Sequence, residues 1–439
     1  MDQLSLYDIA YEKFKITKPI RLIELFAGYG SQALALKYLG VNFEHWKICE
    51  WAIKSIQAYK DIHFTDIDIK LNSKRTKEDM INFLYQKGIS SNYNDPMTKE
   101  QISRLNEEQL KTIIKNIAIT HNLVNIQQVK GEDLEIVDTD KYCYIMTYSF
   151  PCQDLSLAGK GQGMSDTSTR SGMLWEVERI LTEIPNKPHV LLMENVPQVH
   201  GVDNLQDFNK WKLRLEELGY QNYFQDLIAT DYGIPQTRNR TFMVSILGDY
   251  NYTFPKPILL KLKLKDMLEN DVDKKYYLSD KMLDYMWGVN ANNNFNRGEV
   301  FERNLNKVNN ENLAATLTTN AGNRSTDNFI IIKNATKQGY LKATIGDGID
   351  ISSRMEHHRG TVQKGKTQTL TTMCGENNGV VEDNLRIRKL TPRECFRLMG
   401  VRDEDYDNVS KNQSDSSLYH LAGDSIVVNV LMAIFKEML

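Results

Sequence analysis

The sequence is poor in cysteine, with five among 439 residues, at positions 49, 143, 152, 374 and 395. No Cys-x-x-Cys pair and no Cys/His cluster has zinc-site spacing, which argues against a disulfide framework and a structural metal. Long apolar runs are also missing: Val190 to Met193 and Ser425 to Ile434 are too short to cross a bilayer. Because the N-terminal residues lack a basic stretch followed by an apolar core, we expect no secretory signal and a place in the reducing cytoplasm.

An excess of positive charge is lacking as well. Lys and Arg number 54 against 57 Asp and Glu, which gives a formal net charge of −3. Nucleic-acid phosphates are bound by Lys and Arg, so this balance argues mildly against a nucleic-acid protein. A basic groove can nevertheless coexist with an acidic remainder, and composition leaves the substrate open. The length suffices for two domains.

Strand and helix patterns alternate along the first 250 residues. Residues 20–50 predict a strand, a glycine-rich turn, a helix and a second strand. Further strands are expected at Tyr142 to Thr147, Val190 to Met193 and Thr241 to Ile246, and helices at Met173 to Leu181 and Phe208 to Leu218. This alternation predicts an α/β fold with a doubly wound, mainly parallel sheet.

Two stretches depart from that pattern. Residues 66–130 are polar and rich in Lys and Glu, which predicts an inserted helical segment; Thr98 and Gln101 fit a capping box there. We interpret this insert as a solvated elaboration rather than a partner site. After Pro255 and Pro257 the chain becomes rich in Asn, Thr and Gly as far as about residue 385, which predicts a separate small lobe of short strands. The last 50 residues become helical again.

Polar residues follow three of the predicted strands. The turn Ala27 to Gly30 could let a ligand approach the backbone at a helix N-terminus, and Glu50, after the next strand, could accept both ribose hydroxyls. Taken alone, such a turn is more often only a turn. Cys152 in Ser149-Phe150-Pro151-Cys152-Gln153 follows a buried strand and would become a nucleophile if its pKa were lowered. An isolated cysteine is more often a buried structural residue.

The neighbouring residues favour the nucleophile. Glu194 ends the next strand, so its carboxylate would emerge at the same edge as Cys152, where it could hold or protonate a ring nitrogen of a base. Arg238 and Arg240 alternate at a strand entry and should face one side, as suits a phosphate or a polarised carbonyl. A surface salt bridge for the acid and a solvent-facing pair of arginines are the alternatives.

Together these motifs resemble the DNA (cytosine-5)-methyltransferase family. The matching segments stand in the family's order and leave out only the insert and the small lobe: Phe26-Ala27-Gly28-Tyr29-Gly30, Pro151-Cys152-Gln153, Glu194-Asn195-Val196, Asp231 to Arg240, Arg388 to Gly400, and Gly423 to Val427. Two departures are visible. Ser31 stands where the family often has a second glycine, and Asp424 stands where Asn is common, so Ser425 is the safer carry-over in the final block.

The resemblance implies a doubly wound mixed sheet of the S-adenosylmethionine-dependent, Rossmann-like methyltransferase type. A catalytic and cofactor-binding domain would span 1–249, a target-recognition domain 250–386, and a C-terminal segment 387–439 would return to the first domain. Methyl transfer from S-adenosyl-L-methionine to C5 of a flipped-out cytosine in double-stranded DNA is the implied reaction. The implied catalytic residues are Cys152, Glu194, Arg238 and Arg240; the cofactor residues are Phe26, Ala27, Gly28, Gly30, Glu50, Asp133, Pro151 and Ser425; the DNA residues are Gln153, Ser156, Lys160, Arg170, Gln236, Asn323 and Arg324.

The resemblance also implies a monomer that needs no metal and a lid from Gly159 to Ser171. It further implies that a cognate restriction endonuclease, where there is one, acts as a separate protein. An RNA (tRNA) cytosine-5 methyltransferase is an alternative, although the long small lobe favours DNA. A catalytically silent DNA-binding relative is disfavoured by the presence of Cys152, Glu194 and both arginines. Adenine amino-methylating enzymes need an Asn/Asp-Pro-Pro-aromatic segment that this sequence lacks.

Overall fold

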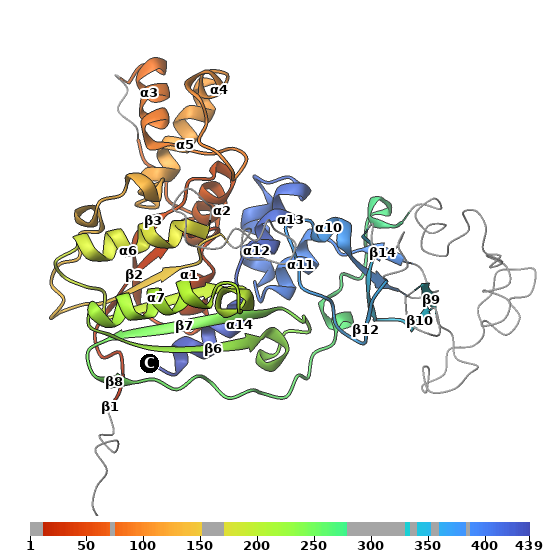
Figure 1. Ribbon diagram of the computed structural model, residues 1–439. Helices are drawn as coiled ribbons and strands as arrows, with labels where there is room; N and C mark the ends of the chain where they lie inside the picture. Colours follow the sequence, from red (N-terminus) through yellow and green to blue (C-terminus); the bar gives the residue numbers. More distant parts are fainter. Residues whose placement is uncertain are drawn as a thin grey trace, which may run out of the picture.

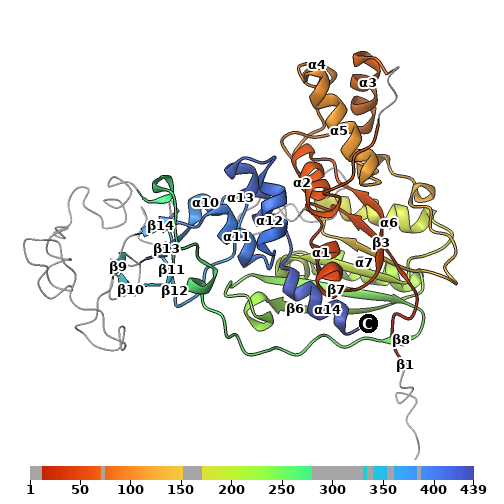
Figure 2. The same cartoon turned by 180° about the vertical axis from the view of Figure 1, so that it is seen from behind.

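The computed structural model describes residues 12–70, 75–151, 171–278, 330–333, 340–352, 360–382 and 387–439. These residues form a central α/β layer, a helical projection from its edge, and a smaller β lobe joined to the layer by helices (Figures 1 and 2).

The central layer is built on a six-stranded sheet of order β3-β2-β4-β5-β7-β6. Strands β3, β2, β4 and β5 are parallel, whereas β7 is antiparallel to both of its neighbours. The sheet is therefore mixed, and β6 is a strand that the sequence pattern did not predict. The strands span Ile20–Leu25 (β2), Phe43–Cys49 (β3), Cys143–Tyr148 (β4), Val190–Asn195 (β5), Tyr220–Ile228 (β6) and Asn239–Leu247 (β7); Glu12–Lys13 (β1) and Tyr250–Asn251 (β8) pair beside it.

Helices cover both faces of this sheet. Successive side chains of a strand point to opposite faces, so Leu22 and Leu192 pack on one face with α1 (Ser31–Tyr38) and α14 (Val428–Lys436). Ile23 and Met193 pack on the other face with α6 (Leu174–Glu183) and α7 (Leu205–Glu217). Figure 2 shows α1 and α14 on the near side, and Figure 1 shows α6 and α7. The two cores hold the carboxyl ends of the parallel strands at one edge.

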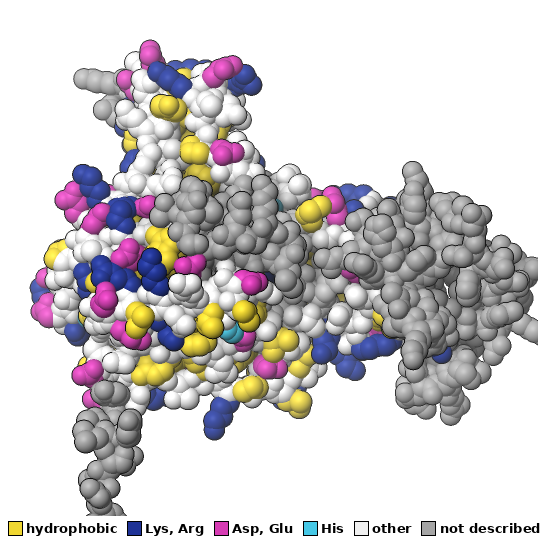
Figure 3. Space-filling view, viewed as in Figure 1, with side chains coloured by type: hydrophobic (Ala, Val, Ile, Leu, Met, Phe, Trp, Pro, Cys, Tyr) yellow, Lys and Arg dark blue, Asp and Glu magenta, His cyan; other side chains and the backbone are white. Residues whose placement is uncertain are grey.

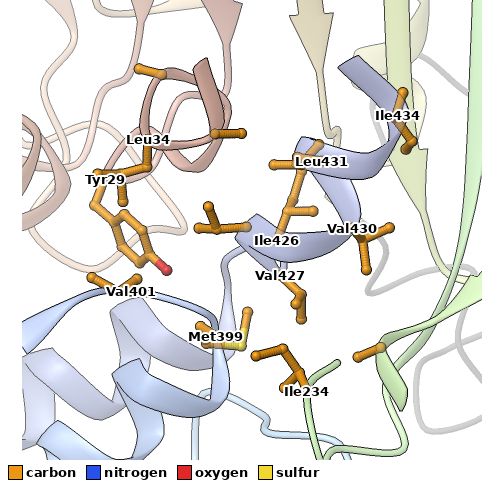
Figure 4. Close-up of a cluster of buried hydrophobic side chains, with 14 of the residues drawn as sticks. Tyr29, Leu34, Ile234, Met399, Val401, Ile426, Val427, Val430, Leu431 and Ile434 are labelled. Carbon is orange, nitrogen blue, oxygen red and sulfur yellow. The ribbon is translucent and has the colours of Figure 1, made fainter. Parts of the chain in front are cut away.

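The C-terminal helices complete the first of these cores. Ile426 and Leu431 lie beside Leu34 of α1, with Met399 below them (Figure 4). By length and composition alone, the stretch Asp415–Lys436 is apolar enough to cross a membrane, with 67% of its most apolar window buried. The structure divides that stretch into α13 (Asp415–Gly423) and α14, and its apolar side chains serve the protein core.

The insert forms the helical projection. It contains α3 (Lys77–Lys87), α4 (Lys99–Ser103) and α5 (Glu107–Ile119). The predicted capping box of Thr98 and Gln101 is confirmed, with both reciprocal hydrogen bonds present. A second capping box, at Asn106, begins α5, so α4 and α5 are separate helices. Both helices pack into one apolar cluster that includes Ile56 of α2 (Ile53–His63).

The smaller lobe carries an antiparallel sheet of order β12-β11-β13-β14 and a two-stranded β9–β10 hairpin. Its elements are Ile330–Lys333 (β9), Tyr340–Ala343 (β10), Gly348–Asp350 (β11), Val362–Gln363 (β12), Cys374–Asn377 (α10), Asn378–Val381 (β13) and Ile387–Lys389 (β14), followed by Pro392–Leu398 (α11) and Asp403–Ser410 (α12). At its base Arg388 and Glu394, both fully buried, form two parallel hydrogen bonds of 2.7 Å. This pair fixes β14 to α11.

Candidate active site at the carboxyl edge of the sheet

The turn after β2 is tight and is held by the end of β3. Phe26, Gly28 and Gly30 all have left-handed backbones, with φ of 58°, 55° and 84°. The amides of Phe26 and Ala27 both donate to the carbonyl oxygen of Cys49, at 2.8 and 3.3 Å. The turn thereby presents the N-terminus of α1 at the carboxyl edge of the sheet, where a helix end favours negatively charged ligand groups.

The two glycines of this turn face different surroundings. A Cβ atom on Gly28 would meet no atom within 4 Å, so this side of the turn borders open space. A Cβ atom on Gly30 would collide with Tyr59 and His63 of α2. The turn therefore packs on α2 through Gly30 and leaves the backbone at Gly28 accessible to a ligand.

Glu50 lies directly opposite Gly28. Its carboxylate accepts hydrogen bonds from the amides of Gly28 at 2.9 Å and Ala52 at 2.7 Å. Asn122 holds the Glu50 backbone from the other side, accepting from its amide and donating to its carbonyl oxygen. Burial raises the pKa of Glu50 to about 7, although the two amides oppose the shift. Sequence reasoning missed Asn122, whose one signal was its place where the insert returns to the sheet.

Asp133 does not join this group, and its predicted place near the cofactor is wrong. Its carboxylate caps its own turn by accepting from the amide of Lys130 at 2.8 Å. The adjacent Gly131 donates to Glu183 at the end of α6. Since β5 begins a few residues after Glu183, this turn lies at the amino edge of the sheet, opposite Glu50.

The turn that leads to Cys152 is tied to the next strand. Asn195, the last residue of β5, donates from Nδ2 to the carbonyl oxygen of Phe150 at 3.0 Å. Asn195 also accepts from the amide of Val196 at 2.8 Å. Pro151, half-buried, is the last described residue here; the predicted Cys152, Gln153, Ser156, Lys160, Arg170 and the lid that runs to Ser171 lie outside the described residues, apart from the end of that lid. The positioning role of Asn195 was not assigned from the sequence.

Glu194, one residue earlier, faces Arg240 of β7. The Nε atom of Arg240 lies 3.2 Å from Oε1 of Glu194, and both side chains are largely buried. Burial raises the pKa of Glu194, while Arg240 and then Arg238 oppose the shift. The predicted acid and one of the predicted arginines thus form an ion pair at the carboxyl edge.

Arg238 has a different position. Its guanidinium group is buried and donates to three carbonyl oxygens, those of Leu370 at 2.7 Å, Gly423 at 3.2 Å and Ser425 at 2.7 Å. These acceptors come from the smaller lobe, from the last residue of α13 and from the turn that follows it. Arg238 therefore joins the lobe, the C-terminal segment and β7, whereas only Arg240 pairs with Glu194.

Gln236 was predicted to contact DNA, and this assignment is wrong. Its side chain is fully buried, donates to the carbonyl oxygen of Leu398 at 2.8 Å and accepts from the amide of Leu370 at 3.0 Å. The flanking backbone also pairs with Thr367. Gln236 thus connects the two lobes, and its amide group is occupied within the protein.

The turn Asp424–Val427 connects the two halves of the site. Ser425 binds Arg238 through its carbonyl oxygen, while the amide of Ile426 donates to Ser31 Oγ at the start of α1. Asp424 raises the pKa of both Glu50 and Glu194. Its own pKa is raised to about 6 by the surrounding protein, against the effect of Arg238 and Arg240. The Asp424 side chain is exposed to solvent and lies within electrostatic reach of both Glu50 and Glu194.

Comparisons with known proteins show the family to which the chain belongs. The family model of C-5 cytosine-specific DNA methylases matches residues 83–439. The chain belongs to this family. It is 32% identical to Type II methyltransferase M2.ScrFI of Lactococcus lactis subsp. cremoris, over 95% of this chain and 99% of that protein. It is 30% identical to Orphan methyltransferase M.SssI of Spiroplasma monobiae, over 96% and 97% of the two chains. The resemblance seen in the motifs is confirmed, and the protein is a DNA cytosine-5 methyltransferase.

Solved structures support the fold of this methyltransferase. The methyltransferase EhMeth of Entamoeba histolytica superposes with a TM-score of 0.55 at 14% identity, over 96% of this chain and 98% of that one. A DNMT2 protein of Spodoptera frugiperda gives 0.53 at 16% identity, over 95% and 99%. The predicted mixed α/β sheet of the methyltransferase type is confirmed. Membership of the family and the fold imply the use of S-adenosylmethionine and a DNA substrate.

Proposed function

We propose that this methyltransferase transfers a methyl group from S-adenosyl-L-methionine to C5 of cytosine within a specific double-stranded DNA sequence, through a covalent adduct with Cys152. The Glu194–Arg240 pair is the observation that carries the proposal. It places an acid and a cation at the edge where the turn leading to Cys152 is anchored by Asn195. An acid, a cation and a nucleophile at one edge suit addition to a flipped-out base.

The cofactor fits the other half of the site. Glu50 keeps lone pairs for both ribose hydroxyls beyond the two backbone amides that it accepts. The open space at Gly28 admits the cofactor to the backbone, and the nearby turn holding Ser425 borders α1. When bound there, S-adenosylmethionine supplies an electrophilic methyl group on a sulfonium. Phe26, Ala27 and Pro151 would line the same edge.

A residue of the site can be assigned to each step of the reaction. The Cys152 thiolate adds to C6 of the cytosine, and Glu194, as the acid, donates a proton to N3 and neutralises the charge pushed into the ring. The C5 carbon then takes the methyl group. Loss of the C5 proton to a base, release of the Cys152 thiolate and return of the N3 proton to Glu194 restore the aromatic ring. Arg240 would bind the base O2 while holding Glu194 in place; Arg238 supports both from the lobe junction.

The DNA backbone would meet a group of lysines on the smaller lobe. Lys263 and Lys265 lie beside the 364–366 segment, where Leu264 donates from its amide to the carbonyl oxygen of Gly365. Dark-blue side chains gather next to the grey atoms at the lower edge of Figure 3. The group consists of Lys263, Lys265, Lys342, Lys364 and Lys366. A local basic surface of this kind reconciles the net charge of −3 with a nucleic-acid substrate.

Sequence readout remains assigned to the lobe as a whole. Asn323 and Arg324 lie outside the described residues. We further propose a monomer that acts in the cytoplasm, because one lobe facing one catalytic layer already forms a DNA cleft; a restriction endonuclease, where present, would act separately.

The test is methyl transfer from labelled cofactor to mixed-sequence duplex DNA, with Cys152→Ala as the paired variant and the product base identified. We expect 5-methylcytosine from the wild type and no product from the variant. Labelling of RNA instead of DNA would overturn the substrate, and equal labelling by both proteins would overturn the role of Cys152.

A further inference from the structure

The insert is joined to the backbone that carries Glu50. The amide of Ser90 donates to the carbonyl oxygen of Trp51 at 2.8 Å, and the amide of Ile53 donates to that of Ser90 at 2.9 Å. Between these lies Ala52, whose amide binds the Glu50 carboxylate. The segment 89–97, which we name the insert loop, is therefore paired directly to one side of the cofactor site.

The insert loop holds one aromatic residue in an unusual backbone conformation. Tyr93 has a φ of 64°, a region that bulky residues rarely adopt. The conformation is fixed on both sides: Asn92 Oδ1 accepts from the amides of Asn94 and Asp95, and Ser90 Oγ donates to the carbonyl oxygen of Asp95. Backbone strain that surrounding hydrogen bonds maintain commonly marks a functional position.

Tyr93 reaches from the insert to the C-terminal segment. Its ring stacks on that of His420 in α13, with centroids 3.9 Å apart and an angle of 31° between planes. The Tyr93 hydroxyl is buried next to Ser55 of α2 and Ser417 of α13, although neither provides good hydrogen-bond geometry. Tyr93 is thus wedged between α2, which begins just after Glu50, and α13, which ends just before Asp424.

Electrostatics agree with this position. Burial raises the pKa of the Tyr93 hydroxyl, and the nearby carboxylates of Glu50 and Asp424 add to the shift. Burial lowers the pKa of His420, so its imidazole is neutral at pH 7 and the two rings stack without a charge between them. Glu50 and Asp424, which are far apart in the sequence, therefore both lie close to the side chain of Tyr93.

We propose that the Tyr93–His420 contact closes the outer wall of the cofactor site and retains S-adenosylmethionine there. This inference rests on the proposed function, because it concerns the same cofactor. Tyr93 acts as a positioning residue: it fixes α13 against the insert loop and thereby holds Asp424, which follows α13, in place relative to Glu50. The insert then has a role in cofactor retention, beyond that of a solvated elaboration.

The test compares cofactor binding by the full-length protein and its Tyr93→Ala, Tyr93→Phe and His420→Ala variants. Calorimetry with S-adenosylmethionine and stopped-flow measurement of its release are the readouts. We expect Tyr93→Ala and His420→Ala each to weaken binding by about fivefold to tenfold, the effect of removing one aromatic ring from a stacked pair, mainly through faster release. Tyr93→Phe, which keeps the ring, should bind like the wild type. At saturating cofactor kcat should stay within twofold, on the order of experimental scatter, while KM rises.

Tyr85→Ala is the matched control, because Tyr85 belongs to the same insert but is 51% exposed on α3. Since alanine at a φ of 64° could destabilise the loop, His420→Ala in a regular helix provides an independent variant. Unchanged affinity and release in His420→Ala and Tyr93→Ala would overturn the inference. Absence of S-adenosylmethionine binding by the wild type would instead overturn the proposed function.

Discussion

Arg240 extends across from β7 to Glu194 of β5, and the two side chains meet at 3.2 Å where these antiparallel strands reach the carboxyl edge. If Glu194 is the proton donor to the base, Glu194→Gln should lower kcat about 10²- to 10⁴-fold, the usual contribution of a general acid. Single-turnover methylation at saturating DNA and cofactor measures the effect. Cofactor affinity should be unchanged, since Glu50 and not Glu194 is the proposed ligand of the ribose.

The same pair predicts a change in pH dependence. Arg240 holds the pKa of Glu194 down against the effect of burial, so Arg240→Gln should raise that pKa. The protonated, donating form then persists to higher pH, and the alkaline limb of the kcat profile should move up by about one unit. A limb that moves down, or one that is present unchanged in Glu194→Gln, would contradict the assignment.

Asp424 should distinguish the cofactor from its product. S-adenosylmethionine carries a positive sulfonium, whereas S-adenosylhomocysteine has a neutral sulfur. In the proposed complex the sulfur lies between the ribose at Glu50 and the base at Glu194. A carboxylate that acts electrostatically on both of these residues would favour the cation. Asp424→Asn should therefore reduce the ratio of the product Kd to the cofactor Kd by roughly threefold to tenfold, as expected for one partly solvated charge pair.

This discrimination should depend on pH. The pKa of Asp424 is raised to about 6, so its carboxylate is ionised above that pH and protonated below it. The preference for the sulfonium should be present at pH 7.5 and fall as the pH passes below about 6. Glu50 also titrates in this region, with a pKa of about 7. Calorimetry on Asp424→Asn separates the two titrations, because only the part of the pH dependence that is lost in this variant arises from Asp424.

Arg238 should affect stability more than Arg240 does. Removing its guanidinium leaves the buried carbonyl oxygens of Leu370, Gly423 and Ser425 without this donor. We expect Arg238→Ala to lower the free energy of unfolding by about 3 kcal/mol or more, measured by urea titration. Arg240→Ala, at a site-facing position, should change it far less. Equal losses in both variants would argue against the junction role of Arg238.

The lysine group on the smaller lobe should determine part of the salt dependence of DNA binding. Lys263→Ala and Lys265→Ala should each weaken binding and reduce the slope of log K against log salt by about 0.9 for each phosphate that the lysine neutralises. Lys99→Ala, exposed on the insert, is the control and should leave the slope unchanged. Fluorescence anisotropy over a range of salt concentrations provides the measurement.

The centre of the parallel half could be predicted from the sequence because β2, β4 and β5 are buried on both faces and read as apolar runs. Strand β3 lies within the segment 20–50, where a second strand was predicted, and β5 extends the predicted run Val190 to Met193 by two residues. Strand β6 was missed because it lies at the edge of the sheet, where polar residues such as Gln225 and Asp226 are exposed. The antiparallel direction of β7 cannot be read from alternation alone.

The site followed the same logic. Glu50 directly follows β3 and Glu194 lies in the last two residues of β5, so their place at one edge follows from the topology. Asn122 was missed because it meets Glu50 only after the chain has passed through the insert, and Asp133 was misplaced because the path of that return was unknown. Gln236 was assigned to DNA binding from the sequence because its burial depends on where residues 367–370 pack.

The hydrogen bond between Ile426 and Ser31 joins residues 395 positions apart. During synthesis the turn after β2 emerges early, but its contacts with the C-terminal segment cannot form until the last helices have been made. The slow step in forming the enzyme should thus be the late docking of α14 onto α1, as expected of a fold rich in distant contacts. A nascent or truncated polypeptide would therefore be inactive, and only the complete protein would methylate the DNA of its host.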